Sequence, residues 1–251
     1  MAEVSFELDL PTIQPEDIAS AEVDEAIDAV DPVALALCAY GAIIRDPLLT
    51  KRPILNLHPS LLPRWRGATP IERAIMEGDT ETGVSIIQLV DELDAGPVAS
   101  QAGIPILPSD NFESLSARLV DVGAQLLATE LANAEAGELA FTPQAGEGVT
   151  YAERFAAEDR FLDPKDSAAT ALRKLRALTP HIGARLRLND EEVLGIKAAS
   201  LAEQAVTPGE IRLEGSLALV GFADGTVQID RLVPPGGKEM SASDWLRGRG
   251  N

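Results

Sequence analysis

The spacing of apolar residues predicts the elements of the first half of the chain. Residues 20–31 place apolar side chains at helical spacing on an acidic segment, whereas 33–39 and 54–58 are short continuous apolar runs. Short apolar runs between turn residues are typical of buried parallel strands. We therefore expect a helix over 20–31 and strands over 33–39 and 54–58, preceded by a short extended segment at 11–14.

The clearest helix pattern follows the second of these strands. Thr69 stands at an N-cap position, Pro70 at the first helical position and Glu72 where a capping box needs an acid. Gly78 marks the expected end of this helix. Its expected buried stripe consists of Ile71, Ala74 and Ile75.

Strand and helix patterns continue to alternate beyond this helix. The expected elements are strands over 84–90 and 98–106, a loop over 91–97 between them, and a helix over 111–134 capped by Asp110. Such alternation is typical of a parallel sheet covered by helices. The expected fold class is therefore α/β, with a doubly wound, Rossmann-like sheet in this part of the chain.

The pattern changes after a segment rich in Gly, Pro, Thr and Gln around residues 136–150. One helix is expected over 167–178, and the turn residues Asn189-Asp190 and Asp224-Gly225 separate short alternating segments beyond it. The expected strands are 184–188, 193–198, 209–213, 217–222 and 226–232. Because short antiparallel strands indicate a small β-barrel, we expect an OB-like domain here. The domain boundaries that follow are 1–140, a linker over 141–150, and 151–251.

Charge is distributed unevenly along the chain. The net charge is −19, and residues 1–150 carry 25 acidic against 7 basic side chains. This first part should repel nucleic-acid phosphates, so any contact with RNA favours the second part. No apolar run is long enough to cross a bilayer, and the acidic N-terminus is unlike an export signal, so we expect a cytoplasmic protein. Cys38, the single cysteine, is expected to be a small buried apolar group.

A polar group with catalytic potential lies at the end of the second predicted strand. Asn56 and His58 are two residues apart, so their side chains leave the same face of a strand, and prolines fix the loop beyond them. Asp94, in the predicted loop, adds a carboxylate. An amide donor, an imidazole and a carboxylate can stabilise a developing oxyanion and move a proton. The structural alternatives are polar residues that merely end a strand and an acidic turn residue.

Three segments of the chain resemble a known family. They are NLHPSLLPRWRGATPIERAI from residue 56, GVSIIQLVDELDAGPV from residue 83 and MSASDWLRGR from residue 240. The first two are similar to the 10-formyltetrahydrofolate-dependent formyltransferases. The third, with YAERF at 151–155, narrows the resemblance to the bacterial methionyl-tRNA formyltransferase family, over most of the chain from about Leu10 to Arg249.

The resemblance implies a function and a set of site residues. It implies transfer of a formyl group from 10-formyltetrahydrofolate to the amino group of methionyl initiator tRNA, without a metal ion. By similarity, Asn56 and His58 would hold the formyl oxygen as it becomes negative, and Asp94 would orient His58. The folate donor would lie against Ser60, Leu61, Leu62 and Pro63, with Tyr40 and Gly41 near the same pocket.

Basic residues of the second domain are the candidates for binding tRNA. They are Arg173, Lys174 and Arg176 on one helix face, with Arg185, Arg187, Arg247 and Arg249 elsewhere. The alternative is scattered charge that keeps the surface soluble. In the first domain, Arg64 and Arg66 could meet an anionic substrate or the folate tail, or they could be solvated loop residues, and Trp65 is assigned to the active-site loop. We expect His181 to be a surface or interdomain residue.

The resemblance also implies that the first domain is incomplete. In the family, two strands, a glycine-containing turn and a basic loop precede the position where Met1 falls, so we expect 33–39 to form an exposed apolar edge. A start placed too late, a separate fragment and a non-functional remnant are three explanations. The alternatives to the leading function are formyl transfer to a sugar nucleotide or another small amine, and RNA binding without catalysis. A monomer is the expected state.

Overall fold

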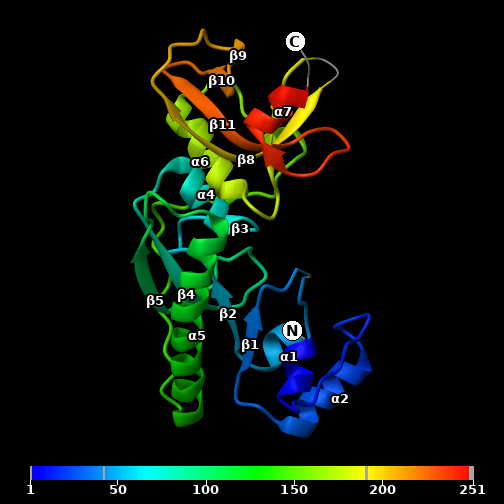
Figure 1. Ribbon diagram of the computed structural model, residues 1–251. Helices are drawn as coiled ribbons and strands as arrows, with labels where there is room; N and C mark the ends of the chain where they lie inside the picture. Colours follow the sequence, from blue (N-terminus) through cyan, green and yellow to red (C-terminus); the bar gives the residue numbers. More distant parts are fainter. Residues whose placement is uncertain (1, 42, 190–191, 249–251) are drawn as a thin grey trace. The chain divides into compact units, whose positions relative to one another are not determined.

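The computed structural model describes residues 2–41, 43–189 and 192–248 (Figure 1). Contacts within the chain define two compact units, and each is described by itself. The first unit comprises Met1–His58, Ser85–Ser100 and Ala124–Gln144, and the second comprises Pro59–Val84, Gln101–Gly123 and Ala145–Asn251.

The first unit begins with three helices and two strands. They are α1 (Ala2–Glu7), α2 (Ala21–Val30), β1 (Leu35–Cys38), α3 (Leu48–Lys51) and β2 (Ile54–His58). The strand β1 runs parallel to β2, with Leu37 opposite Asn56. The predictions of α2, β1 and β2 are confirmed, whereas residues 11–14 belong to no strand. The helices α1 and α3 had no distinct sequence pattern.

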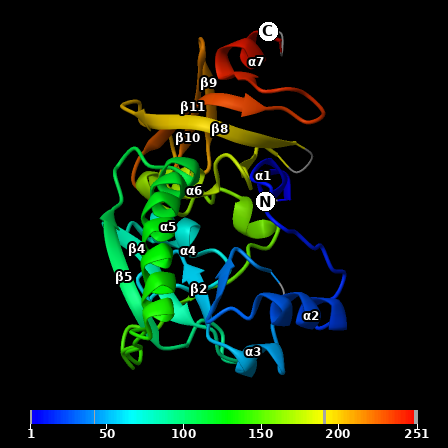
Figure 2. The ribbon, with the colours of Figure 1, turned by 90° about the horizontal axis from the view of Figure 1, so that it is seen from below.

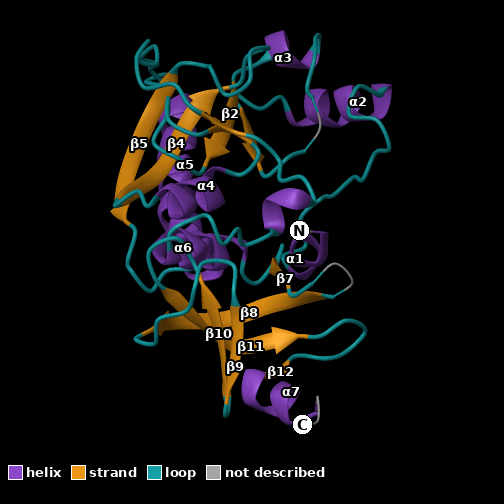
Figure 3. Cartoon of the chain, turned by 90° about the horizontal axis from the view of Figure 1, so that it is seen from above, coloured by secondary structure: helices purple, strands orange, loops and turns teal. Residues whose placement is uncertain are grey.

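Apolar contacts and ion pairs hold α2 and α3 together, and the two helices lie close to each other in Figures 2 and 3. Buried Ile44, Leu48 and Ile54 form a small core that includes Ile27 of α2. At its edge, Nζ of Lys51 lies 2.7 Å from the carboxylate of Asp28. This exposed ion pair lowers the pKa of Asp28, because Lys51 both donates a hydrogen bond and carries a positive charge.

The expectation that Cys38 is buried was wrong. Cys38 is exposed, and partly buried and exposed residues alternate along β1. The cause is the position of the strand, because β1 is the outer member of the sheet order β1-β2-β4-β5 and pairs with β2 alone among the described residues. One side of each pleat therefore faces away from the core. The expected exposed apolar edge at residues 33–39 is thus confirmed.

The sheet is mixed rather than wholly parallel. The strands β4 (Glu81–Gln88) and β5 (Val98–Pro105) continue it, and the loop over 91–97 joins them as expected. However, β2 and β4 are antiparallel, with His58 opposite Ser85 and Leu55 opposite Gln88. The prediction of a purely parallel sheet was therefore wrong. Because β4 enters at the carboxyl end of β2, the connection between them returns to the end it left instead of crossing the sheet.

The second unit contains the helix with the clearest sequence pattern, α4 (Pro70–Glu77). Its bounds and its buried residues Ile71, Ala74 and Ile75 are as predicted, but the capping box is not formed. The Thr69 hydroxyl donates instead to the carbonyl of Glu153, at 2.8 Å. This contact lies beside a short parallel pair of strands, β3 (Arg66–Gly67) and β6 (Tyr151–Ala152).

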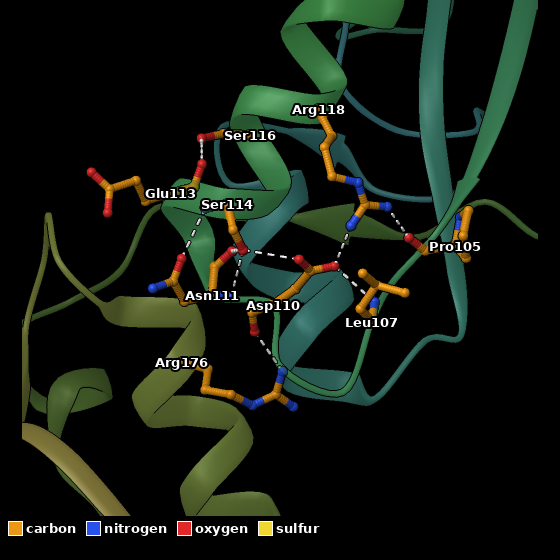
Figure 4. Close-up of polar contacts among 9 residues, drawn as sticks. All are labelled: Pro105, Leu107, Asp110, Asn111, Glu113, Ser114, Ser116, Arg118 and Arg176. Atoms are coloured by element: carbon orange, nitrogen blue, oxygen red, sulfur yellow. Dashed lines mark hydrogen bonds and ion pairs between the residues drawn. The ribbon is translucent and has the colours of Figure 1, made fainter.

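A polar network surrounds Asp110, two positions before α5 (Phe112–Ala136) (Figure 4). The buried carboxylate of Asp110 accepts hydrogen bonds from the Leu107 amide at 2.7 Å, the Ser114 hydroxyl at 2.9 Å and Arg118 at 2.6 Å. Burial is the largest single influence on this carboxyl group and opposes ionisation, but the three donors together outweigh it. The pKa of Asp110 therefore lies below its usual value.

The rest of the second unit is an antiparallel sheet with helices against it (Figures 1 and 2). Its elements are a 3₁₀ turn (Glu158–Arg160), α6 (Ala168–Leu178), β7 (Ala184–Arg187), β8 (Val193–Ala202), β9 (Ile211–Glu214), β10 (Leu217–Gly221), β11 (Thr226–Val233), β12 (Met240–Ser241) and α7 (Ala242–Gly248). The order is β7-β8-β11-β10-β9, and β12 pairs with β11. The short antiparallel strands and α6 confirm the prediction for this region.

An apolar core joins α6, the sheet and α7. Phe222, Leu178, Leu232 and Ile196 are almost completely buried in it, together with Trp245 of α7. The turn at Asp224-Gly225 lies between β10 and β11 as expected, and Asp224 accepts a hydrogen bond from the amide of Ala168 at the start of α6. The other expected turn, Asn189-Asp190, lies partly outside the described residues. Within the described part of the chain, no helix has both the length and the apolar character needed to cross a membrane.

Candidate active site

The first unit places the amide and the imidazole of the predicted site on one strand. Asn56 and His58 both belong to β2, where Asn56 lies opposite Ile87 and His58 lies opposite Ser85 of β4. Because residues two apart on a strand share a face, the two side chains leave the sheet on the same side. His58 is buried and Asn56 is partly buried. Neighbouring strands on both sides fix this part of β2.

The carboxylate of Asp94 lies beside the histidine. Its Oδ2 is 3.6 Å from Nδ1 of His58, and the side chains are only 11% and 6% exposed, respectively. This distance is somewhat longer than a direct hydrogen bond. The two groups, 36 positions apart in the chain, are close enough for the carboxylate to fix the orientation of the imidazole ring.

The loop that carries Asp94 is tightly constrained. Asp94 has a φ of 47°, in the left-handed region that aspartate tolerates better than most residues. Two residues later, Gly96 packs against the sheet so closely that a Cβ on it would lie 1.7 Å from the carbonyl oxygen of Gln88. Only glycine can occupy this position without moving the backbone.

A residue from the predicted linker completes this loop. The side-chain amide of Gln144 donates to the carbonyl oxygens of Asp94, at 2.7 Å, and of Gly96, at 2.8 Å. Thr142 pairs with Val98 through two main-chain hydrogen bonds of 2.8 Å, which bring Gln144 to the loop. Sequence analysis missed Gln144 because no local pattern marks a contact between residues about fifty positions apart.

The second unit contains the residues predicted to bind the folate donor. The hydroxyl of Ser60, which is fully buried, donates to the carbonyl of Arg64 at 2.6 Å. Leu61 packs over two glycines, since a Cβ on Gly83 would lie 2.6 Å from its side chain. The carbonyl of Leu62 accepts from Gln101 at 2.9 Å. The loop over 60–63 is thus ordered by contacts within its own unit, and Ser60 and Leu62 are buried there.

Arg64 and Trp65 have a structural role in the same unit. The guanidinium of Arg64 binds both carboxylate oxygens of Asp79, at 2.7 and 2.8 Å, and this raises the pKa of Arg64. The Trp65 indole N–H donates to the same carboxylate at 2.8 Å, and Arg64 stacks on the indole. Arg64 is therefore an engaged cation, although its side chain remains 43% exposed. Arg66 is buried, and its amide donates to the carbonyl of Thr150.

Tyr40 and Gly41, the softer members of the predicted folate site, follow β1 in the first unit. Both residues are exposed, and the Tyr40 residue is 43% accessible. Among the described residues, no three His, Cys, Asp or Glu side chains are grouped closely enough to hold a metal ion.

The basic face predicted on α6 is engaged in contacts within the second unit. Arg173 donates to the carbonyl of Met76, and Arg176 donates to the carbonyl of Asp110 at 2.5 Å (Figure 4). Lys174 donates to the carbonyl of Phe161 at 2.6 Å, and burial lowers its pKa. These three cations therefore fasten α6 to neighbouring segments.

Other cations of the same unit line a pocket. Its volume is about 510 Å³, and Arg160, His181, Arg185 and Lys197 are among its lining residues. None of the lining residues in the described part of the chain is acidic. Arg160 donates to the carbonyls of Ile182 and Gly183. Burial and the neighbouring charge of Arg185 lower the pKa of Arg160. The predicted residue Arg187 stacks on Phe161, Arg247 pairs with Asp244, and Arg249 lies outside the described residues.

His181 contacts two side chains of its own unit, Glu72 and Phe112. Its Nε2 lies 2.8 Å from Oε1 of Glu72, and its ring stacks on Phe112 with a centroid distance of 3.6 Å. His181 is exposed, as expected for a surface residue, and it contacts α4 and the first residue of α5.

Comparison with known proteins places this arrangement in a family. Two family models match, "Formyl transferase" over residues 2–131 and "Formyl transferase, C-terminal domain" over residues 154–250. A methionyl-tRNA formyltransferase of Halorhodospira halophila is 39% identical over 240 residues, which cover 94% of this chain and 77% of that protein. Another, of Thermotoga neapolitana, is 36% identical over 249 residues, with 98% and 80% covered.

Solved structures with the same fold include more distant proteins. Methionyl-tRNA formyltransferase from Clostridium thermocellum has a TM-score of 0.61 at 16% identity, over 81% of this chain and 88% of that one. HypX from Aquifex aeolicus, solved in complex with tetrahydrofolic acid, has a TM-score of 0.69 at 23% identity, over 88% of this chain and 40% of that one. The fold and the matched domains define a formyl transferase. Given its identity to curated relatives over most of its length, the chain belongs to the methionyl-tRNA formyltransferase family.

Proposed function

We propose that this chain transfers a formyl group from 10-formyltetrahydrofolate to the amino group of methionyl initiator tRNA in the cytoplasm, acting as a monomer. The single observation that carries the chemistry is the 3.6 Å approach of the Asp94 carboxylate to the His58 imidazole, on the strand that also holds Asn56. The similarity to methionyl-tRNA formyltransferases over more than nine-tenths of the chain supports the choice of acceptor.

Each side chain has a distinct part in this proposal. The donor supplies the formyl carbon when bound. As an amine attacks that carbon, its oxygen becomes negative, and the Asn56 amide and the His58 imidazole donate hydrogen bonds to it. Asp94 holds the imidazole in one orientation and stabilises its protonated form, which donates to the oxygen. As the intermediate collapses, the bond between the formyl carbon and the folate nitrogen breaks, and the proton lost by the amine is relayed, with the help of Asp94, to that leaving nitrogen. The near burial of His58 and Asp94 strengthens both effects, because water competes little there.

The donor would bind at the segment that directly follows His58 in the sequence. Leu61, which is partly buried, offers the apolar surface that a flat ring system requires, whereas Leu62 is buried and supports the loop, and Pro63 fixes the backbone. Tyr40 and Gly41, which follow β1, are proposed as further members of the donor site. The Ser60 hydroxyl is committed to Arg64, so we assign Ser60 the task of shaping the loop rather than that of contacting the donor through its side chain.

We propose three parts of the chain: a catalytic domain over 1–140, a linker over 141–150 and a second domain over 151–251. The tRNA would bind through the second domain. Since α6 uses its cations internally, the pocket lined by Arg160, Arg185 and Lys197 is the better phosphate site. The grouping of these three positive side chains favours an anionic partner.

Formylation of charged initiator tRNA tests the proposal. Purified chain, 10-formyltetrahydrofolate and methionyl initiator tRNA should yield formyl-methionine after the ester is cleaved, and His58→Ala should abolish the product. A sugar-nucleotide amine offered in competition should leave the rate unchanged. If the sugar-nucleotide amine is formylated and methionyl tRNA is not, the proposed acceptor is wrong. If the chain binds tRNA and folate but forms no product, the proposed catalytic activity is wrong.

A further inference from the structure

We propose that Gln144 is the positioning residue that sets the Asp94 carboxylate against His58. This inference rests on the proposed function. The side-chain amide of Gln144 donates one hydrogen bond to the carbonyl of Asp94 itself and one to that of Gly96, at 2.7 and 2.8 Å. It therefore clamps the backbone on both sides of Ala95.

The loop needs such a clamp because its conformation is unfavourable on its own. A φ of 47° at Asp94 is sparsely populated for any residue with a side chain and persists only when surrounding contacts impose it. The carbonyls of Asp94 and Gly96 belong to no strand and receive their donors from one side chain. Without Gln144 the peptide can rotate, and the Asp94 side chain rotates with it.

The clamp is itself held in place by backbone pairing. Thr142, two residues before Gln144, exchanges two hydrogen bonds of 2.8 Å with Val98, the first residue of β5. On the other side, the amide of Gln88 donates to the carbonyl of Pro97 at 3.0 Å. The segment over 142–144 and the end of β4 thus hold the loop between them. Gln144 reaches the backbone of Asp94 directly, through its side-chain amide.

Two substitutions separate hydrogen-bond donation from packing. Gln144→Ala removes the side chain, whereas Gln144→Glu keeps its shape and, when ionised at pH 8, cannot donate to a carbonyl. We expect both variants to lower kcat about tenfold to a hundredfold, because a small displacement of a catalytic group has effects of this size. The KM for the folate donor should change less than twofold. The matched control is Gln125→Ala on the exposed side of α5, which should have the kinetics of the unmodified chain.

A double-mutant cycle shows whether Gln144 acts through Asp94. Asp94→Ala alone should lower kcat, and adding Gln144→Ala to it should produce no further loss, since the group to be positioned is absent. If kcat of the double variant falls by the product of the two single losses, the proposal is overturned. An active Gln144→Glu variant would also overturn it, since this would show that packing alone matters.

Hydrogen exchange tests the clamp without any turnover. In Gln144→Ala, the amides of residues 93–96 and 98 should exchange at least tenfold faster than in the unmodified chain, while those of α5 stay unchanged. Unaltered exchange in the loop overturns the proposal even if the enzyme is active. If the unmodified chain fails to formylate methionyl tRNA but the loop exchange rises as expected, the proposed acceptor is wrong and the positioning role of Gln144 stands.

Discussion

Nε2 of His181 lies 2.8 Å from Oε1 of Glu72, although the two residues are 109 positions apart in the chain. The Glu72 side chain is only 8% exposed, so its carboxylate needs a hydrogen-bond partner within the protein, and His181 supplies one. The contact joins α4 to the turn after α6, next to the stacked ring of Phe112. Two segments that belong to different family models are thereby fastened together within one compact unit.

Removal of this contact should destabilise the protein. His181→Ala leaves a nearly buried carboxylate with one partner fewer and removes the ring stacked on Phe112, so we expect a loss of about 1–3 kcal/mol in the free energy of unfolding. Urea unfolding monitored by fluorescence measures it. Glu77→Gln, at an exposed position of the same helix, is the matched control and should unfold at the same urea midpoint as the unmodified chain. Equal midpoints for His181→Ala and the control would contradict this prediction.

The stability contributed by Asp110 should depend on pH in a definite direction. Its folded pKa is lowered, because the donors from Leu107, Ser114 and Arg118 outweigh burial. The contribution is therefore fully present above the unfolded value of about 3.9 and is lost as the pH falls through the folded pKa. Figure 4 shows the contacts of Leu107, Ser114 and Arg118 converging on the Asp110 carboxylate.

Asp110→Asn tests that sign. At pH 7 the variant should be less stable than the unmodified chain by about 1–3 kcal/mol, since it loses charge-assisted hydrogen bonds. Below about pH 4 the difference should shrink, because the unmodified carboxyl group then begins to take up its proton. Urea unfolding curves at several pH values measure the difference, and a constant gap from pH 3 to pH 7 would disprove the role of ionisation.

Much of the local structure could be predicted from the sequence. The strand β2 has the bounds expected from its apolar run, and Pro70 and Gly78 mark the start and end of α4 as expected. These features depend on neighbours within a few positions. The proximity of His58 and Asp94 was also predicted, although it rested on the resemblance to a family rather than on spacing.

The features that the sequence did not predict depend on distant partners. The direction of β4 follows from where its chain enters the sheet, and Cys38 is exposed because β1 has one neighbour among the described strands. Glu72 has the spacing of a capping box but binds His181 instead. Gln144 looked like a linker residue, because nothing near it shows that its amide reaches Asp94. A local sequence pattern does not show which distant residue a side chain will contact.

Asn56→Ala should reduce turnover without weakening the donor's binding. We expect kcat to fall by about a hundredfold to a thousandfold, the range found when one oxyanion donor is removed. Steady-state kinetics with charged initiator tRNA give kcat, and equilibrium dialysis with a folate gives affinity. Asn133→Ala, on α5, is the matched control. A variant that keeps kcat but loses folate affinity would place Asn56 in donor binding instead.

Gly96→Ala should disturb the Asp94 loop more than any other glycine substitution in the first unit. The added methyl group would lie 1.7 Å from the carbonyl oxygen of Gln88, so the backbone must shift. We expect at least a tenfold loss of kcat, because Asp94 moves with the loop, and a lower melting temperature. Gly137 is unsuitable as a control because its φ is 71°. Gly146→Ala, with nothing within 4 Å of the new atom, is suitable and should be neutral in both assays.

Charge reversal in the pocket lined by Arg185 and Lys197 should weaken tRNA binding. Each cation that meets a phosphate contributes to the salt dependence of affinity, so Arg185→Glu and Lys197→Glu should each raise the Kd for tRNA and reduce the slope of log K against log salt by about one. Filter binding at several salt concentrations measures both quantities. Lys165→Glu, at an exposed position flanked by acidic residues, is the matched control and should bind as the unmodified chain does. If all three variants lose affinity equally, the effect is that of net charge, and the pocket is not the phosphate site.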